Sequence, residues 1–543
     1  DQIIYFDLEV GTKEGPALIK VTAISGNEKS SYEFNLNVSN PNPISFEVYD
    51  FVIEPNKTDQ LNFQTFGIAG SNTAHVELSV MPPLNLEHRL NYLIGYPHGC
   101  LEQVTSGAFP QLYLKELMEI NGAQGIAIQK NINAAIQKVM HYQIPNGGFA
   151  YWPGANQANT WATSYVGHFL IEAEKKGYQL PVGFKKKWID YQKNAAKNWT
   201  VKLNVENDLD QAYRLYTLAL AGAADLSAMN RLKSTENISS NTKLRLAATY
   251  ALVGQKDAAL QLVKSANLDN LAPKSTQYFD SQERNYAMAL ETFVLIKDKT
   301  LARKMADKTA NSLSSKKWLS TQSAAYSLLA MAQYSALVGG NSFNADYQIN
   351  GKKSSVSSTK PIQQSKLSIN RGNNKLEVKN TAQSTIFGRV IVGGVLPLGS
   401  EKPIERGMEI KVNYRDGSGA YMDLSKIMQG TDVIADIRIS NKTNARVENI
   451  ALGHIIPSGY EIVNMRFTEF GGNADNSVDY TDIRDDRTNF YFGLNAFQTK
   501  TFTVRMSASF PGKYYFPGTQ AEAMYDNEYF VRTEGRWVEI GKN

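Results

Sequence analysis

The sequence predicts a multidomain α and β protein, in which a helical domain is inserted into a β domain and a β-sandwich follows. The hydrophobic period changes along the chain from two residues to about 3.6 and back to two. Each of the two β-type segments that flank the helical one is too short for a stable sheet of its own. At about 150 residues per domain, the 543 residues are enough for three or four domains with separate cores.

Strand patterns fill the first 83 residues. Residues 1–40 contain the β-rich run 17–23, and the Asn-Pro-Asn-Pro sequence at 40–43 marks a boundary. In the segment 41–83, residues 45–49 are rich in β-formers and residues 75–80 alternate apolar with polar, which predicts a half-buried strand. About three strands fit into this segment, and a sheet of two or three strands is marginal.

Helical periodicity covers residues 84–337. Apolar stripes with helical spacing occur at 128, 132, 136, 139 and 140 and again at 166, 169, 170 and 173. The pattern predicts about a dozen helices with short connections, which close into a toroid or stack into a solenoid. Clean sequence repeats are not visible, and this favours the closed toroid.

Strands return in the segment 338–400, for example at 366–369 and 375–378. The simplest arrangement pairs this segment with 41–83 in one β domain, so that the helical domain is an insertion. Residues 401–543 are predicted to form a terminal β-sandwich. Their clearest strand is 501–510, where apolar side chains alternate with Thr, Arg or Ser.

Composition excludes several functions. The net charge of +5 is spread along the chain, so nucleic-acid binding has little support. No apolar run reaches about 18 residues, which predicts no transmembrane segment, and the first residues lack the features of a signal peptide. One cysteine rules out an intrachain disulfide and a cysteine-built zinc site. The acidic cluster at 479–486 does not have EF-hand spacing and has Arg484 inside it and Arg487 directly after it, so we expect neither a metal nor a cofactor.

The single cysteine, Cys100, stands where the helical pattern begins. It is a small buried hydrophobe, a catalytic nucleophile, or one half of a Cys–Gln cross-link. A nucleophile needs a positioned base, but Gly99 leaves the geometry of the nearby His98 unfixed, and no papain-like or caspase-like signature surrounds the cysteine.

A cross-link with Gln103 is the more specific interpretation. In a tight turn that Gly99 permits, the sulfur of residue i reaches the amide carbon of residue i+3, and loss of ammonia gives an internal thioester. Gln103 is then the electrophile and Cys100 the leaving group, because a thiol leaves more readily than an amide nitrogen. A helix N-terminus beside Cys100 is expected to favour the departing thiolate.

The motif Gly99-Cys100-Leu101-Glu102-Gln103, with Tyr96-Pro97 before it and Thr105-Ser106 after it, resembles the thioester motif of the bacterial alpha-2-macroglobulin family. The resemblance extends along essentially the whole chain. It includes, in order, the segments 146–152, 160–166, 455–461, 479–487 and 522–526.

The resemblance implies an α/α toroid thioester domain at 84–337, inserted in a CUB-type β domain made of 41–83 and 338–400. It further implies that residues 1–40 end a macroglobulin-like β domain and that residues 401–543 form the terminal macroglobulin-like β-sandwich. Members of the family are broad-spectrum endopeptidase inhibitors rather than enzymes. A protease cleaves them, they change shape, and a lysine amine of the protease attacks the exposed thioester and is tethered.

By the same resemblance, the chain is the C-terminal portion of such an inhibitor. Its upstream domains, including the bait segment, are missing, so we expect that it cannot trap a protease by itself. The partners are target proteases. The full-length form is expected in the periplasm or cell envelope, held by a lipid anchor, where it serves bacterial defence.

Several residues are expected to support the thioester. Glu102 orients the ring or is an ordinary acid of a first helical turn, and Tyr525 matches the residue that shields the thioester across the domain interface. Large aromatic rings exclude water, and the candidates for a dry wall are Tyr96, Phe149, Tyr151, Trp152, Trp161 and Tyr165. The segment 151–159 lacks the histidine that redirects some members toward hydroxyls, which implies direct reaction with amines.

Two other functions remain open from the sequence. One is a macroglobulin-like binding scaffold in which the thioester never forms. The other is a glycan-processing enzyme, because helical toroids commonly carry paired carboxylates. No such pair can be singled out in this sequence.

Overall fold

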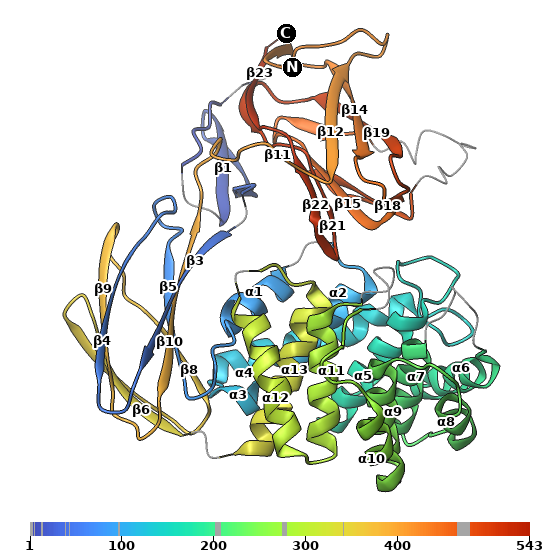
Figure 1. The fold of residues 1–543 in the computed structure, drawn as a ribbon. Coiled ribbons are helices and arrows are strands. Elements are labelled where there is room, and N and C mark those ends of the chain that lie inside the picture. The colour runs from blue at the N-terminus through green and yellow to red at the C-terminus, as the bar shows by residue number, and fades with distance from the viewer. Residues whose placement is uncertain are drawn as a thin grey trace.

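The computed structural model consists of a helical domain flanked by two β assemblies, with a β-ribbon at the N-terminal end (Figure 1). It describes residues 4, 6–11, 15–38, 40–42, 44–95, 98–200, 208–273, 280–315, 317–339, 342–463 and 478–542, apart from the side chain of Asn527.

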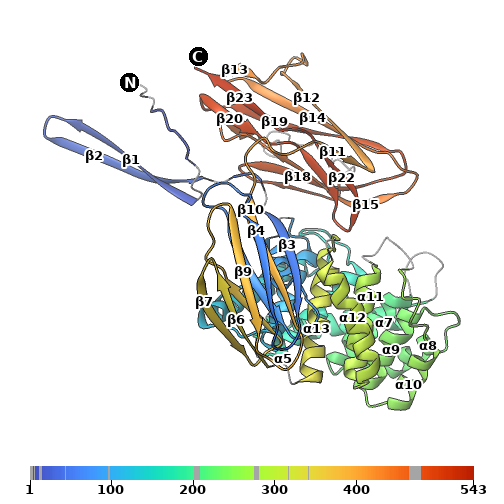
Figure 2. The same ribbon diagram turned by 60° about the vertical axis from the view of Figure 1, so that its left-hand side comes forward.

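The ribbon consists of β1 (Gly15–Ser25) and β2 (Glu28–Val38), which pair antiparallel. It projects away from the rest of the chain (Figure 2). The turn uses Gly26 at φ 59°, a left-handed conformation that suits glycine. The predicted strand at 17–23 lies within β1, so that prediction is confirmed.

Eight strands form two four-stranded sheets with the orders β3-β10-β5-β8 and β4-β9-β6-β7. The strands before the helical segment are β3 (Ile44–Ile53), β4 (Thr58–Gln64) and β5 (Thr73–Ser79); those after it are β6 (Phe343–Ile349), β7 (Lys352–Ser358), β8 (Ile362–Lys366), β9 (Asn373–Asn380) and β10 (Ile386–Val395). Val390 of β10 faces Tyr49 on one side and Val76 on the other. Each sheet therefore combines strands from both segments.

One of these strands is displaced from its predicted position. The run 366–369 was expected to be a strand, but β8 ends at Lys366. The apolar residue that anchors β8 is Ile362, which is fully buried. Leu367 still donates a backbone hydrogen bond of 2.8 Å to Ala74, so the chain follows β5 for one residue more.

Six helices form a ring in which each contacts the next and the last contacts the first. They are α2 (Leu101–Ala108), α5 (Thr160–Lys175), α7 (Asp208–Leu220), α9 (Ser240–Leu252), α11 (Gln282–Leu295) and α13 (Thr321–Val338). Outside them lie α1 (Leu86–Gly95), α4 (Gly122–Val139), α6 (Phe184–Asn198), α8 (Leu226–Lys233), α10 (Lys256–Ser265) and α12 (Lys299–Ser314). Short elements follow α2 and α4, namely η1 (Phe109–Tyr113), α3 (Leu114–Leu117) and η2 (Met140–Tyr142).

Side-chain caps start four of the ring helices. Asn159, Ser239, Ser281 and Ser320 each accept a hydrogen bond from the backbone N–H three residues later. Such caps satisfy amides that have no partner inside the helix. The helices thus begin where the sequence supplies a short polar side chain before an apolar run.

The strands of residues 404–541 form sheets of six, four and three strands, with the orders β11-β22-β21-β15-β18-β17, β12-β14-β19-β16 and β13-β23-β20. In sequence order they are β11 (Ile404–Arg406), β12 (Met408–Arg415), β13 (Lys426–Met428), β14 (Asp432–Asn441), β15 (Val447–Ile455), β16 (Tyr460–Ile462), β17 (Tyr480–Ile483), β18 (Arg487–Leu494), β19 (Thr499–Ala508), β20 (Gly512–Phe516), β21 (Gln520–Ala523), β22 (Asp526–Arg532) and β23 (Arg536–Gly541). We call this assembly the terminal β-sandwich.

The alternation predicted for 501–510 is largely confirmed. Phe502, Val504, Met506 and Ala508 of β19 are buried, and the side chains between them point away from the core. Phe510 was expected to continue this face, but it lies beyond the end of β19 and is 53% exposed.

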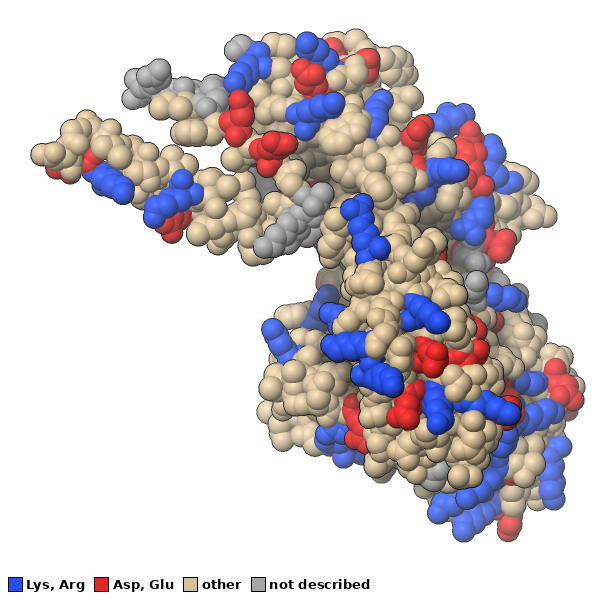
Figure 3. Space-filling model, turned by 90° about the vertical axis from the view of Figure 1, so that its left-hand side faces the viewer, with Lys and Arg blue, Asp and Glu red and all other residues tan. Residues whose placement is uncertain are grey.

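Charged side chains of both signs are interspersed on the face shown in Figure 3. In the 479–486 cluster, Arg484 pairs with Asp482 at 2.8 Å and Arg487 pairs with Asp486 at 2.6 Å. Among the described residues, no group of three or more His, Cys, Asp or Glu is arranged to hold a metal ion. In the same part of the chain, no helix is both long enough and apolar enough to cross a bilayer.

Candidate functional site

The terminal β-sandwich touches the helical domain beside α2, where the turn between β21 and β22 descends (Figure 1). A small apolar cluster fills this junction. It combines Cys100 and Trp152 of the helical domain with Ala451, Tyr491 and Met524 of the terminal β-sandwich. The single cysteine of the chain therefore lies at a domain interface.

Cys100 is the N-cap of α2, as the sequence predicted, with φ −64° and ψ 167°. Gly99 before it has φ 72°, and a Cβ at this position would lie 3.2 Å from Lys138 Nζ. The Gly99 carbonyl accepts a hydrogen bond of 2.6 Å from the Tyr142 hydroxyl. The backbone N–H of Leu101 donates to the carbonyl of Tyr151 at 3.1 Å. The turn is thus held from two sides.

The thiol of Cys100 is fully buried. It donates to the Tyr151 hydroxyl at 3.1 Å and lies 3.5 Å from the Tyr525 hydroxyl. Burial, followed by the charge of Glu102, raises the pKa of the thiol to about 12. The backbone N–H of Gln103 at the start of α2 lowers this pKa, as expected of a helix N-terminus, but the loss of solvation outweighs it.

Gln103 follows in the first turn of α2 and is 4% exposed. Cys100 and Gln103 thus both lie at the start of α2, and the approach of the sulfur to the Gln103 amide carbon stays a prediction. The side-chain Nε2 donates to the thioether sulfur of Met524 at 3.2 Å, and Oε1 is buried without a hydrogen-bond partner among the described residues. A buried amide with a weak acceptor and an unpaired oxygen is costly.

Glu102 is also completely buried. It accepts hydrogen bonds from the Thr321 hydroxyl at 2.8 and 3.1 Å, from the Tyr525 hydroxyl at 2.8 Å, and from Ser106. Burial raises the pKa of Glu102, and these hydroxyl donors oppose the rise. Glu102 is an acid of the first turn of α2, as one interpretation had it, but two of its hydroxyl donors come from outside that helix, Thr321 from α13 and Tyr525 from the terminal β-sandwich.

The hydroxyl groups of Tyr151 and Tyr525 are hydrogen-bonded to each other. Burial raises the pKa of both tyrosines well above the usual value, so both stay neutral. Tyr525 thus contacts Cys100, Glu102 and Tyr151 from across the interface, at the position where the resemblance placed a shielding residue.

Aromatic rings close the junction around Trp152, which is 6% exposed. Tyr480 stacks on it with ring centroids 4.8 Å apart, and Tyr491 lies at 4.2 Å. His98 links the two domains, because its Nδ1 lies 3.1 Å from the Tyr491 hydroxyl and its Nε2 lies 3.3 Å from Glu522 Oε1.

The other expected wall residues have different positions. Tyr165 reaches the site indirectly, through a contact of 3.0 Å with Ser106. Trp161 does not join the junction cluster; its ring lies 4.7 Å from that of Tyr213 and 4.1 Å from the guanidinium of Arg284, inside the helical domain. Phe149 is buried in the core of the helical domain, and Tyr96 lies outside the described residues.

Sequence reasoning missed four contributors, namely Tyr480, Tyr491, Met524 and Thr321. The first three belong to a domain more than 300 positions away in the sequence, and Thr321 looks like any first residue of a helix. Tyr480 and Met524 do lie in segments quoted for the resemblance, and this is the only local signal that marks them.

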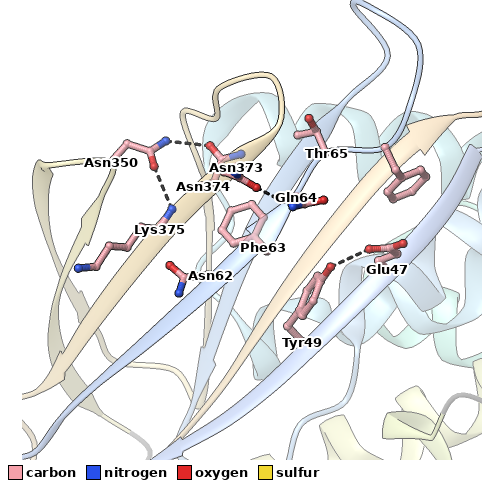
Figure 4. A pocket seen from close by; sticks show the side chains of 11 residues that line it. Glu47, Tyr49, Asn62, Phe63, Gln64, Thr65, Asn350, Asn373, Asn374 and Lys375 are labelled. Carbon is pink, nitrogen blue, oxygen red and sulfur yellow. Dashed lines mark hydrogen bonds between the residues drawn. The ribbon is translucent and has the colours of Figure 1, made fainter.

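A polar pocket of about 700 Å³ lies in the other β domain, between β3, β4 and β9 (Figure 4). Glu47 is the only acid among its described lining residues, and it accepts a hydrogen bond of 2.7 Å from Tyr49. Gln64 donates to Asn373 at 2.6 Å. Glycoside hydrolysis generally needs two carboxylates, so this pocket does not support the glycan-processing alternative.

Comparison with family models gives two matches. The model of the A-macroglobulin TED domain matches residues 74–322, and the model of the bacterial alpha-2-macroglobulin MG10 domain matches residues 407–528. Together they span more than half of the chain. The Cys100 turn lies in the first match and Tyr525 in the second.

Curated relatives include the alpha-2-macroglobulin of Escherichia coli, 25% identical over 82% of this chain, and an alpha-2-macroglobulin homolog of Yersinia pestis, 22% identical over 99% of it. The matches span 28% and 29% of those two proteins, so the chain corresponds to less than a third of their length.

Solved structures show the same fold. Native alpha-2-macroglobulin of E. coli, from domain MG7 to the C-terminus, matches with a TM-score of 0.82 at 20% identity, covering 97% of this chain and 88% of that one. Salmonella alpha-2-macroglobulin reacted with methylamine matches with a TM-score of 0.81 at 21% identity, covering 97% of this chain and 36% of that one. The chain belongs to the bacterial alpha-2-macroglobulin family and matches the C-terminal portion of its members.

Proposed function

We propose that Cys100 and Gln103 form an internal thioester, and that the chain is the thioester-bearing part of a broad-spectrum protease-trapping inhibitor. In this proposal a lysine amine of an attacking protease adds to the Gln103 carbonyl carbon. The carbon–sulfur bond breaks, an isopeptide bond forms, and the amine proton passes to the Cys100 thiolate.

The observation that carries the proposal is the environment of Gln103. As an amide, its side chain is buried with one weak acceptor and with an oxygen that no described residue pairs, a costly arrangement for a group that can both donate and accept. A thioester has no N–H groups to satisfy and is a poorer acceptor, so the same apolar surroundings suit it better. The solved Salmonella relative that was reacted with methylamine also supports reaction with an amine.

The junction explains how such a group would be stored. Water must be kept from a thioester until it is used, and Trp152, Tyr480 and Tyr491 cover the Cys100 turn with large rings. The lid consists of side chains from a second domain, so a separation of the two domains would open it. A shape change after protease cleavage elsewhere in a full-length protein provides such a separation.

The proposal includes the domain assignment that the resemblance implies. The closed helix ring supports an α/α toroid at 84–337. Sheets shared between 41–83 and 338–400 support a CUB-type domain that carries the toroid as an insertion. The β1–β2 ribbon is assigned to the end of a preceding macroglobulin-like domain, and 401–543 to the terminal one.

Target proteases are the proposed partners, and the full-length protein is proposed to act in the periplasm or cell envelope, held by a lipid anchor. Both assignments rest on the resemblance. Osmotic-shock fractionation of cells that express the full-length protein checks the location, and an accumulation of the protein in the cytosolic fraction would contradict it.

The direct test is intact mass together with thiol titration. We expect the purified chain to be lighter than its sequence by one ammonia and to have a blocked Cys100. Methylamine should then add to the chain and release one thiol, whereas the Cys100→Ser and Gln103→Ala variants should show neither change. A chain with the full sequence mass and a freely titrating thiol, prepared under conditions that exclude hydrolysis, would contradict the proposal. It would support the alternative, a macroglobulin-like binding scaffold in which the thioester never forms.

Preference for amines is a second test. The segment 151–159 contains no histidine, and His98 is engaged with Tyr491 and Glu522, so direct aminolysis is expected. In a competition experiment, labelled methylamine should be incorporated with little effect of glycerol. Equal incorporation of glycerol would contradict this expectation.

A further inference from the structure

We propose that Tyr151, Tyr525 and Glu102 carry away the proton of the Cys100 thiol when the Cys100–Gln103 thioester closes. The inference rests on the proposed function, because it concerns how the same bond is made. It assigns a role in that closure to a residue of the terminal β-sandwich.

The relay is a continuous chain of hydrogen bonds with one direction. The Cys100 thiol donates to the Tyr151 hydroxyl at 3.1 Å, and Tyr525 donates to Glu102 Oε2 at 2.8 Å. The two tyrosine hydroxyls are hydrogen-bonded to each other. Since Tyr525 gives its proton to Glu102, Tyr151 is the donor of the middle bond. Each donor therefore points away from the sulfur and toward the carboxylate.

The site needs such a relay because the thiol does not ionise unaided. Burial raises the pKa of Cys100 to about 12, so at neutral pH almost none of it is the nucleophilic thiolate. His98, the nearest histidine in the sequence, is held by Tyr491 and Glu522. The Glu102 carboxylate at the end of this hydrogen-bond chain is the proton acceptor that the geometry supplies.

Glu102 is suited to accept and release a proton. Its donors are the hydroxyls of Ser106, Thr321 and Tyr525, which support the carboxylate without the full charge of a cation. Burial raises its pKa, so it takes up a proton more readily than an exposed carboxylate does.

The reaction balances without any co-reactant. The Cys100 sulfur attacks the side-chain carbon of Gln103 while its proton moves along the two hydroxyls to Glu102. The carbon–nitrogen bond of the amide then breaks, and the nitrogen leaves with that proton as ammonia. One S–H bond and one C–N bond are replaced by one C–S bond and one N–H bond.

The terminal β-sandwich takes part in this chemistry, because Tyr525 lies in the turn between β21 and β22. The relay is complete only when this domain is docked on the helical domain. Closure of the reactive bond is therefore coupled to the same docking that hides the bond from water, so a thioester does not form in a chain that cannot yet protect it.

The test uses ammonia to reverse the reaction. Ammonia opens the thioester to the original Gln103 amide and free thiol, and after its removal the thiol titre of the 543-residue chain is followed with time and pH. We expect the wild-type chain to close again, with a rate that falls as acid protonates Glu102. The variants Glu102→Gln and Tyr525→Phe should close about 100-fold more slowly, and Glu102→Gln should lose that acid limb.

Tyr460→Phe is the matched control, since Tyr460 is another buried tyrosine of the terminal β-sandwich and its hydroxyl has no partner in the described structure. It should close at the wild-type rate. Tyr151→Phe removes one hydroxyl from the relay and keeps the ring. If Glu102→Gln does not fold, this variant tests the relay in its place and should also close more slowly than the wild-type chain. Thermal melting and circular dichroism establish that each variant is folded.

The outcomes separate this inference from the proposed function. A wild-type chain with full mass and a free thiol contradicts the function. A wild-type chain that has the thioester, with folded relay variants that close as fast as it does, contradicts only the relay. The relay is also overturned if the wild-type chain never closes again after ammonia, or if Tyr460→Phe is slowed as much as Tyr525→Phe.

Discussion

Two glutamates of the helix ring are equally buried but have opposite surroundings. Glu291 of α11 accepts from Arg245 at 2.7 Å and from Tyr326 at 2.6 Å, and His168 Nε2 lies 3.6 Å away. Burial opposes its ionisation, but Arg245 and His168 outweigh burial and lower its pKa. Glu102 of α2 has hydroxyl donors instead, and its pKa is raised.

The difference distinguishes a structural carboxylate from a chemically available one. A guanidinium at 2.7 Å fixes Glu291 in the ionised state, so this group holds helices together and does not exchange protons near neutral pH. Hydroxyl donors satisfy Glu102 in either protonation state, because a hydroxyl can donate or accept. Burial alone therefore does not identify a functional acid; the nature of its partners does.

The largest expected effect comes from the loss of the cation. Arg245→Met leaves Glu291 buried without its partner and should lower the free energy of unfolding by about 3–5 kcal/mol. Glu102→Gln keeps an acceptor for the same hydroxyl donors and should cost only about 1 kcal/mol. Urea denaturation measures both. Equal losses of unfolding free energy for the two variants would show that Glu291 does not depend on its cation more than Glu102 depends on its charge.

Acid should weaken the Glu291 region. Burial lowers the pKa of His168 to about 4, whereas an unfolded histidine titrates near 6.5. Between these values the unfolded chain binds more protons than the folded chain, so stability falls as the pH drops from 6.5 to 4. The contribution of His168 is about 3 kcal/mol at most. In His168→Gln, the free energy of unfolding measured by urea denaturation should change less with pH across this range.

The Glu102 region has the opposite sign. Because its pKa is raised in the fold, the folded chain holds a proton that the unfolded chain has already lost, and stability from this group falls as the pH rises above the unfolded value. In Glu102→Gln, the free energy of unfolding should therefore fall less steeply as the pH rises. A Glu102→Gln variant that instead becomes more sensitive to acid would show that the carboxylate is stabilised by charge, as Glu291 is.

A smaller effect is expected from Thr321→Val. The Thr321 hydroxyl approaches both carboxylate oxygens of Glu102, at 2.8 and 3.1 Å, and its removal should cost about 1–2 kcal/mol of unfolding free energy and raise the pKa of Glu102 further. Thermal denaturation and the rate of thioester closure report the two effects. Thr309→Val is the control, because Thr309 is a buried threonine that bonds only within α12, to the Met305 carbonyl at 2.8 Å.

The smallest effect is expected from Tyr165→Phe, which probes the link between the two regions. Tyr165 lies 3.0 Å from Ser106 on the Glu102 side, and its ring stacks on Tyr326 on the Glu291 side. Since the ring is kept, the loss should be about 1 kcal/mol or less, with normal thioester content. A marked fall in methylamine incorporation would mean that the two regions are coupled through this ring.

Local patterns predicted the elements that carry the site. The spacing of Cys100 and Gln103 and the glycine before them gave the turn at the start of α2, and Gly99 has the left-handed backbone that was expected. Prediction was weaker for side chains on the ring helices. Trp161 was expected beside the thioester motif but points into the helical domain, because the rotation of α5 is set by packing against Arg284 and Tyr213.

Strand registers could not be predicted for the interface. The positions of Tyr480 and Tyr491 depend on the pairing of β17 with β18, in which these two residues are opposite each other. A slip of β17 by one residue against β18 would turn the Tyr480 ring to the other face. Nothing in the local sequence of either strand states which neighbour its rings will cover.

The sequence by itself determined the motif from Gly99 to Gln103, the helical and β segments, and the resemblance on which the family expectation depended. Only the tertiary structure decided that Glu102 has hydroxyl partners from α13 and the terminal β-sandwich, and that the Cys100 thiol is held protonated. The physical reason is that a helix start or an apolar alternation depends on neighbours a few positions away, whereas desolvation and hydrogen bonding at this site depend on residues 151, 321 and 525, which reach it only when three distant parts of the chain are packed together.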